Sequence, residues 1–197
     1  VATNAWKSRE ADNTAMSGSM PTGSGLGITG SQSIKAKTMA MNADGNVIVL
    51  GDQAAKNATV WIYDEASKSW TQRGDTLTCN QTLKQDSRFA ISVDISDDGN
   101  RVVVSDQFQG NNGPTSPYGD VYVYDWDQAG NVWKSQTVYG DTLHEFGSHV
   151  SLSGDGAVLA VSAGDGIFNG DPSTAPDPMP VEMFTRVYRY SAGDDTW

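Results

Sequence analysis

The chain contains 197 residues with a formal net charge of −11; only 19% of the residues are charged, and 21 are glycine. A low fraction of charged residues together with abundant glycine favours short strands joined by turns. No apolar stripe of helical period is long enough to predict a helix. A nucleic-acid or anionic-membrane partner would need a basic surface, which an acidic chain without a Lys/Arg cluster does not offer. No run of about 18 apolar residues occurs, so we expect no membrane span.

The chain opens with a stretch that reads as a strand, residues 1–8, followed by a Gly/Ser/Thr-rich loop at 17–33. After it, the same order of elements recurs three times. Each unit has a first strand, an Asp-Gly turn, an apolar second strand, an alternating aromatic third strand and a fourth strand opened by tryptophan. The expected strands are 36–41, 47–50, 60–63 and 70–72, then 89–95, 101–104, 121–124 and 133–135, and finally 146–152, 158–161 and 187–190.

Each unit contains an Asp-Gly pair that predicts a tight hairpin turn, because glycine readily adopts the positive φ that such a turn needs. The second strand is apolar at consecutive positions, which predicts a strand covered on both faces. The third strand alternates, which predicts one packed and one wetter face. The three turns contain Asp44-Gly45, Asp98-Gly99 and Asp155-Gly156.

Four of the six tryptophans, Trp6, Trp70, Trp133 and Trp197, mark the repeat, with spacings of 64, 63 and 64 residues. Four antiparallel strands in about 64 residues describe a β-propeller blade, so we predict an all-β fold. The predicted division is 6–69, 70–132 and 133–197 for three repeats, the last with an incomplete outer strand. Residues 1–5 would end a preceding blade or form a swapped outer strand. Because propellers usually have four to eight blades, we expect a part of a larger propeller or one completed by other chains.

The third unit resembles the FG-GAP repeats of integrin-α-like propellers, through Phe146-Gly147 and the Asp155-Gly156 turn that follows. The second unit has Phe89-Ala90 at the Phe-Gly position, and the first has Lys35-Ala36. Gly51 keeps a later glycine of the pattern in the first unit only. The resemblance implies an extracellular propeller that presents ligands on loops at one face. It also implies calcium loops of the form Asp-x-Asp-x-Asp-Gly, which many such blades carry.

The nearest match to a calcium loop is Asp94, Ser96 and Asp98, since several oxygens are what a hard cation needs. Ser96 is a weaker ligand, and Val102 replaces the later acid, so a simple hairpin turn is the favoured interpretation. A second candidate is Asp165, Asn169 and Asp171, although Gly and Asp also form ordinary turns. We expect no cofactor other than Ca²⁺ at one of these sites.

Candidate ligand-binding residues are Trp126, which falls outside the tryptophan period, and Tyr118, because exposed aromatics beside Asp and Asn stack on sugars. Catalysis has little support: His144 and His149 are the only histidines, and Cys79 lacks the surroundings of a nucleophile. We therefore do not expect an enzyme.

Acceptor triplets for N-glycosylation begin at Asn57 and Asn80, each in a predicted loop, which supports a secretory route. The expected function is a non-enzymatic extracellular module for adhesion, protein–protein interaction or assembly. The alternative is a lectin-like glycan-binding module, and a hydrolase domain is less favoured. Expected partners are other protein chains, glycans or further copies of the chain, with residues 1–8 completing the last blade of a neighbouring copy.

Overall fold

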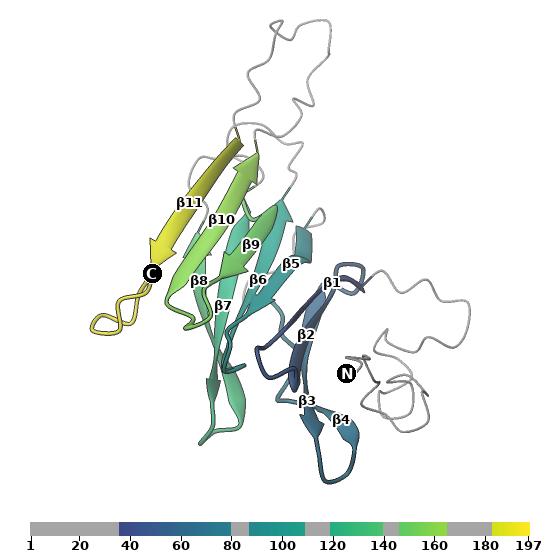
Figure 1. Ribbon diagram of the computed structural model, residues 1–197. Helices are drawn as coiled ribbons and strands as arrows, with labels where there is room; N and C mark the ends of the chain where they lie inside the picture. The colour runs from purple at the N-terminus through teal and green to yellow at the C-terminus, as the bar shows by residue number, and fades with distance from the viewer. Residues whose placement is uncertain (1–35, 80–86, 109–118, 140–145, 165–182) are drawn as a thin grey trace, which may run out of the picture.

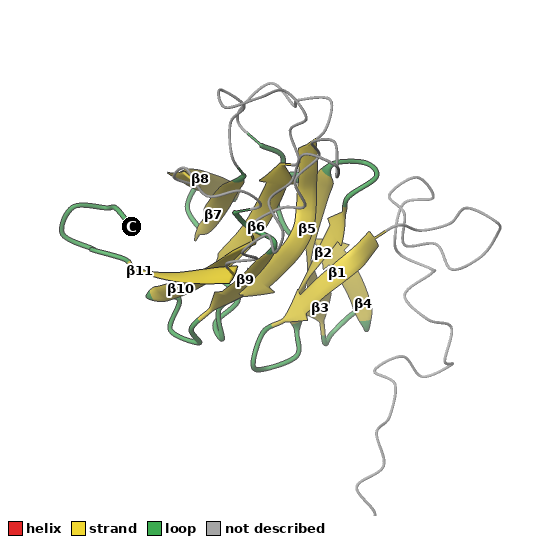
Figure 2. Ribbon diagram, turned by 90° about the horizontal axis from the view of Figure 1, so that it is seen from above, coloured by secondary structure: helices red, strands yellow, loops and turns green. Residues whose placement is uncertain are grey.

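Three antiparallel β-sheets stand side by side in the computed structural model, which describes residues 36–79, 87–108, 119–139, 146–164 and 183–197 (Figure 1). Seen from above, the sheets follow one another in sequence order from one side of the molecule to the other (Figure 2). Two sheets have four strands and the third has three. The prediction of β-propeller blades is confirmed, and we refer to the sheets as blades 1, 2 and 3.

Each blade is a meander in which consecutive strands are neighbours. Blade 1 contains β1 (Ala36–Met41), β2 (Val47–Asp52), β3 (Asn57–Asp64) and β4 (Ser69–Gln72). Blade 2 contains β5 (Ser87–Ile95), β6 (Arg101–Phe108), β7 (Asp120–Asp127) and β8 (Val132–Tyr139). Blade 3 contains β9 (His149–Leu152), β10 (Val158–Gly164) and β11 (Met183–Arg189).

The strands lie where the sequence predicts them, with differences at their ends. Most strands extend beyond the predicted bounds, whereas β9 is shorter than predicted and begins at His149 instead of at residue 146. Phe146 and Gly147 form a turn before it, and Gly147 has a φ of 87° that an extended strand does not allow. The predicted strand at 1–8 and the loop at 17–33 lie outside the described residues.

The Asp-Gly turns have the predicted geometry, with positive φ at Gly45, Gly99 and Gly156 (67°, 72° and 70°). In each turn, a side-chain oxygen three residues before the glycine accepts a backbone N–H from the strand that follows, which closes the turn. These hydrogen bonds are Val47 N to Asn42 Oδ1 (2.9 Å), Arg101 N to Ser96 Oγ (3.0 Å) and Val158 N to Ser153 Oγ (2.8 Å).

The strand pairings show which residues of the blades are equivalent. Val49 of β2 pairs with Val60, Val103 of β6 with Val123, and Ala160 of β10 with Val187. Since side chains alternate along a strand, each blade has two faces. We call the face that carries these pairs the forward face, because in blades 1 and 2 it packs on the next blade, and we call the opposite one the back face.

Two apolar cores fill the junctions between blades. The core between blades 1 and 2 joins Val49 and Val60 to the back face of blade 2, where Phe89 meets Tyr122 edge-on at 5.6 Å. The core between blades 2 and 3 is built in the same way, and Phe146 meets Tyr188 edge-on at 6.3 Å. Most of the buried apolar side chains of the described residues therefore lie between the sheets, and a third, smaller cluster lies on the back face of blade 1.

Replacing Phe89 with Ala tests this description. Phe89 is fully buried in the first junction, so the free energy of unfolding should fall by about 3–5 kcal/mol. Urea unfolding followed by fluorescence measures the loss. Val132→Ala, at a side chain that is 38% exposed, is the control and should change stability by less than about 0.5 kcal/mol. A loss at Phe89 as small as that of the control would contradict a core located between the blades.

Candidate functional site

A lateral contact between turns joins neighbouring blades at one end. The N–H of Ala43 donates to the carbonyl of Asp97 at 3.3 Å, and the N–H of Asp97 donates to the carbonyl of Gly154 at 2.8 Å. The three residues hold the same place in their Asp-Gly turns. Each turn therefore donates to its successor, which sets the spacing of the blades at this end.

An arginine from blade 1 strengthens the first junction. Arg73 donates from Nη1 to the carbonyl of Gly99 and from Nη2 to Asn100 Oδ1, both at 2.7 Å. Its guanidinium lies over the rings of Trp126 and Trp133, 4.6 and 5.6 Å from their centres. Cation–π and hydrogen-bond contacts thus come from one side chain.

A second arginine, on β6, makes the same kind of contact at the next junction. Arg101 donates from Nη1 to the carbonyl of Gly156 at 2.8 Å and lies 4.2 Å from the ring centre of Tyr190. It also forms a two-pronged ion pair with Asp125, at 2.5 and 2.9 Å. Gly99 and Gly156 are equivalent turn glycines, so each arginine binds the same carbonyl of the following blade.

The ring stacked on each arginine belongs to an aromatic pair that recurs in all three blades. The pairs are Tyr63–Trp70, Trp126–Trp133 and Tyr190–Trp197, with ring centres 5.3, 5.0 and 5.5 Å apart. Both members of a pair are seven positions apart in the sequence.

Trp126 lies outside the spacing of the four periodic tryptophans, but within the repeat it is the equivalent of Tyr63 and Tyr190. The strand pairings align 123–126 with 60–63, whereas the expected strands aligned 121–124 with 60–63. The seven-residue spacing from an aromatic to the periodic tryptophan was the signal that would have revealed this. The half-buried Trp126 packs on Trp133 and Arg73.

The oxygens of the first calcium candidate have donors within the fold. Ser96 Oγ donates to Asp98 Oδ1 at 2.6 Å, which also accepts the N–H of Asn100. Asp94 Oδ2 accepts the N–H of Leu152 in blade 3 at 2.7 Å. The structure brings Ser96 and Asp98 together as a closed turn and uses Asp94 to join blades. Within the described residues, no group of three or more His, Cys, Asp or Glu side chains could hold a metal ion.

The structure describes some of the other predicted site residues, and the rest lie outside the described part of the chain. Asn57 is the first residue of β3 and not a loop residue, and Thr59 of its triplet is buried, accepting a bond from Trp61 Nε1 at 3.0 Å. Cys79 is half-buried against the core between blades 1 and 2, and His149 is exposed on β9. Outside the described residues lie Asp165, Asn169, Asp171, Tyr118, Asn80 and His144.

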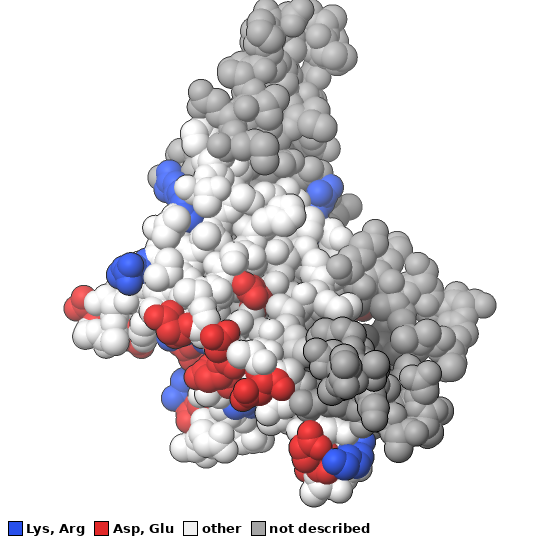
Figure 3. Space-filling model, in the orientation of Figure 1, with Lys and Arg blue, Asp and Glu red and all other residues white. Residues whose placement is uncertain are grey.

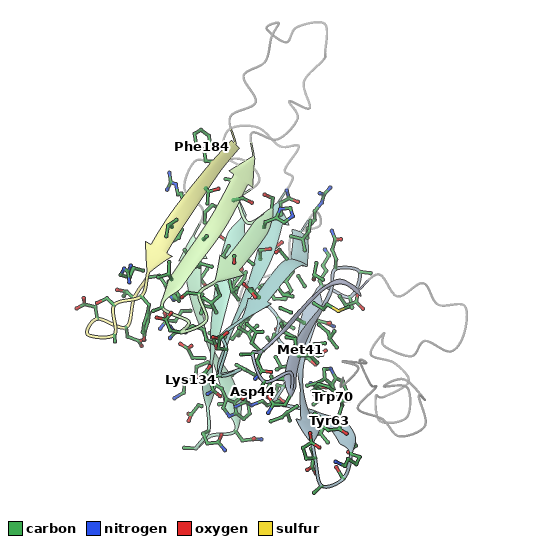
Figure 4. All side chains as sticks on the ribbon, in the orientation of Figure 1. Met41, Asp44, Tyr63, Trp70, Lys134 and Phe184 are labelled. Atoms are coloured by element: carbon green, nitrogen blue, oxygen red, sulfur yellow. The ribbon has the colours of Figure 1, made fainter. Side chains whose placement is uncertain are left out.

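The end faces of the row of blades expose apolar side chains where internal junctions bury them. Val187, on the forward face of blade 3, is 67% exposed, whereas its equivalents Val60 and Val123 are fully buried. On the back face of blade 1, Met39 and Met41 are 67% and 51% exposed. Figure 4 labels Met41 on blade 1 and Phe184 on β11 of blade 3.

Acidic side chains gather in the lower half of the view in Figure 3. Asp44, Asp97, Asp98 and Asp155 are exposed on the Asp-Gly turns. Partial burial raises the pKa of Asp98, but hydrogen bonds from Ser96 and Asn100 outweigh it, and the net pKa lies below its ordinary value of 3.8. The hydrogen bond from Ser153 likewise lowers the pKa of Asp155.

No protein-family model matches the chain, and no curated protein matches its sequence. Among solved structures, the chain is similar to a protein from Lactobacillus plantarum (14% identity, TM-score 0.49, covering 80% of this chain and 38% of that one). It is also similar to TolB from Acinetobacter baumannii (14%, 0.40, 81% and 30%) and to the Dos1 propeller (16%, 0.35, 63% and 27%). The chain thus spans well under half the length of each. No helix that could cross a membrane occurs in the described part of the chain.

The expected membership of the FG-GAP family is wrong, since no protein-family model matches the chain. The Phe-Gly signal has a local cause. Phe89 and Phe146 are fully buried, and the residues after them, Ala90 and Gly147, have positive φ (66° and 87°). The start of the blade therefore requires a buried aromatic side chain followed by a residue with positive φ. This local requirement explains the Phe-Gly pattern without membership of a family.

Replacing Arg101 with Lys tests the second junction. Lysine keeps the charge but loses the two-pronged pair with Asp125 and the planar stack on Tyr190, so we expect a loss of about 1–3 kcal/mol in the free energy of unfolding. Hydrogen exchange should rise at Gly156 and Tyr190 while exchange in β2 stays unchanged. Equal stability of both proteins in urea would show that the arginine contributes nothing beyond its charge.

The turn carboxylates should make stability depend on pH. Because their folded pKa values are lowered, Asp98 and Asp155 stabilise the fold above the unfolded pKa, and this contribution is lost as the pH falls below about 4. Melting temperatures of the native protein and of Asp98→Asn/Asp155→Asn, measured across this range, should fall more steeply for the native protein. Parallel curves would contradict the assignment.

Proposed function

We propose that the chain is a non-enzymatic, extracellular module that binds other proteins through the end faces of its row of blades. The observation that carries the proposal is the exposure of Val187, Met39 and Met41 at places where the internal junctions bury their equivalents. Burying apolar surface of this kind is the main driving force of protein association.

The charge distribution supports the same class of partner. The chain has a net charge of −11, and its turns carry exposed aspartates, so nucleic acids and anionic surfaces are disfavoured. Glycan binding at Trp126 gains no support, because its ring already contacts Arg73 and Trp133 and its Nε1 donates to Gln128 at 3.1 Å.

The extracellular location rests on the acceptor triplets at Asn57 and Asn80 in the sequence. Of the first triplet, the Asn57 side chain is half exposed at the start of β3, and Thr59 is buried. The swapped strand at 1–8 is not part of the proposal. Trp197 stacks on Tyr190 as Trp133 stacks on Trp126.

Oxidation of Met39 and Met41 tests the proposal. Dilute hydrogen peroxide converts exposed methionine to its sulfoxide, and mass spectrometry of peptides measures the rate. A protein that covers the back face of blade 1 should slow oxidation several-fold in untreated extracellular fluid, relative to the purified chain at high dilution. Equal rates at both methionines in the two samples would contradict a protein-binding role for this face.

A further inference from the structure

We infer that the acceptor triplet at Asn57 can receive an N-linked glycan only while blade 1 is unfolded, so that the folded protein is closed to this modification. The inference concerns a modification that the proposed extracellular route implies, and in this respect it rests on the proposed function. Its basis is that the triplet, residues 57–59, lies in a strand of blade 1 with paired neighbours on both sides, instead of in a loop.

The reaction needs access to two side chains of the triplet at once. A transferase joins the anomeric carbon of an oligosaccharide, carried on a lipid diphosphate, to Nδ2 of the asparagine. The bond from that carbon to the diphosphate oxygen breaks, the lipid diphosphate leaves with the bonding electrons, and Nδ2 loses one proton to solvent. The enzyme recognises the hydroxyl of the third residue together with the asparagine, which is why the triplet requires Ser or Thr there. Asn57 and Thr59 must therefore both be free to enter its active site.

The backbone of the triplet is held on both of its edges. On one edge, residues 57–59 pair with residues 50–52 of β2. On the other edge, the N–H of Ala58 donates to the carbonyl of Leu77 at 3.0 Å, and the N–H of Leu77 donates back to the carbonyl of Ala58 at 2.8 Å. A segment paired in this way cannot bend into the active site of an enzyme without losing these hydrogen bonds.

The side chains of the triplet are unequally exposed. Asn57 is half exposed at the start of β3, so the acceptor residue considered alone indicates an open site. Thr59, however, is 7% exposed, and its Oγ1 accepts the N–H of Trp61 Nε1 at 3.0 Å. Trp61 is itself only 1% exposed. A transferase therefore cannot reach the hydroxyl that it must recognise while this tryptophan stays in place.

Opening the triplet requires the unfolding of blade 1, because the residues around Thr59 belong to two apolar clusters. Ala58 and Val60 are fully buried in the core between blades 1 and 2. Trp61 belongs to the buried cluster on the back face of blade 1. Fraying of the end of β3 cannot free Thr59, since both clusters would have to open with it. The rate of modification should therefore follow the fraction of molecules in which blade 1 is unfolded.

Segments beyond the described residues can only close the triplet further, because packing against blade 1 adds cover and removes none. In a secretory route, glycan transfer to Asn57 and the folding of blade 1 therefore compete for the same chain. Transfer must come first, since the pairing of residues 57–59 with β2 and the burial of Thr59 end it. The fraction of molecules with a glycan at Asn57 thus records how long blade 1 stays unfolded.

Treatment of the unglycosylated full chain with oligosaccharyltransferase and a lipid-linked oligosaccharide tests the inference, and mass spectrometry of peptides measures the glycan at Asn57. The folded native chain should gain almost no glycan there. Phe89→Ala removes a fully buried side chain of the junction and leaves the triplet unchanged. It should be modified at least about 100-fold faster, because its unfolded fraction is larger by that factor. If this variant fails to fold altogether, its modification should be faster still.

Val132→Ala, at an exposed residue of β8, is the matched control and should be modified as slowly as the native chain. Adding Thr59→Val to Phe89→Ala should abolish the glycan at Asn57, which assigns the signal to this triplet. Equal rates for the native chain and Phe89→Ala, or no glycan at Asn57 in either, would overturn the inference. The purified chain reacts independently of its natural location. If it behaves as expected but the natural protein has no glycan at Asn57, only the extracellular location is contradicted.

Discussion

Every blade of this protein depends on contact with the blades beside it, because its second strand is apolar on both faces. A sheet of this kind cannot be stable alone in water, since one apolar face would always be exposed. Blade 2 meets the requirement with a blade on each side, and Val102–Val104 are all buried. In blade 1, Val47–Leu50 are buried as well, although within the described residues a blade covers only its forward face. The junction between blades, and not the single blade, is therefore the unit on which folding depends.

Polar groups give the junctions their register, which apolar packing alone does not define. The N–H of each turn bonds to the next turn, and Arg73 and Arg101 bind the same glycine carbonyl in successive blades. Arg73 directly follows β4, whereas Arg101 is the first residue of β6. The two arginines come from non-equivalent positions of their blades, yet their guanidinium groups occupy equivalent sites. This indicates that the glycine carbonyl and the aromatic pair of the following blade determine where a guanidinium group is needed.

The sequence predicts the strands and turns well because these follow from local rules. Alternation and consecutive apolar residues place the strands, and glycine at positive φ places the turns at Gly45, Gly99 and Gly156. The prediction failed where it needed register between units. In the predicted alignment of the third strands, β7 was displaced by two residues, so Trp126 was not aligned with its equivalents Tyr63 and Tyr190. The displacement went unnoticed because Val121-Tyr122 and Val123-Tyr124 have the same Val-Tyr pattern.

The site could be predicted less well than the fold, because its residues act across blades. Asp94 was a reasonable calcium ligand by spacing, yet its carboxylate accepts an N–H from Leu152, 58 residues away. Likewise, no local pattern marks Met39 as exposed and Val93 as buried, since the two residues hold equivalent places in their blades. Exposure here depends on whether a neighbouring blade is present.

The second strand of blade 3 is less buried than its sequence predicts. Its residues 158–161 are apolar at every position, which predicts a strand covered on both faces, whereas within the described residues only its back face is fully covered. The three second strands are alike in composition, so this one has the same requirement for a neighbour as β2 and β6. The difference between the predicted and the observed burial of Ala160 and Val187 therefore reflects the neighbours of the strand and not its composition.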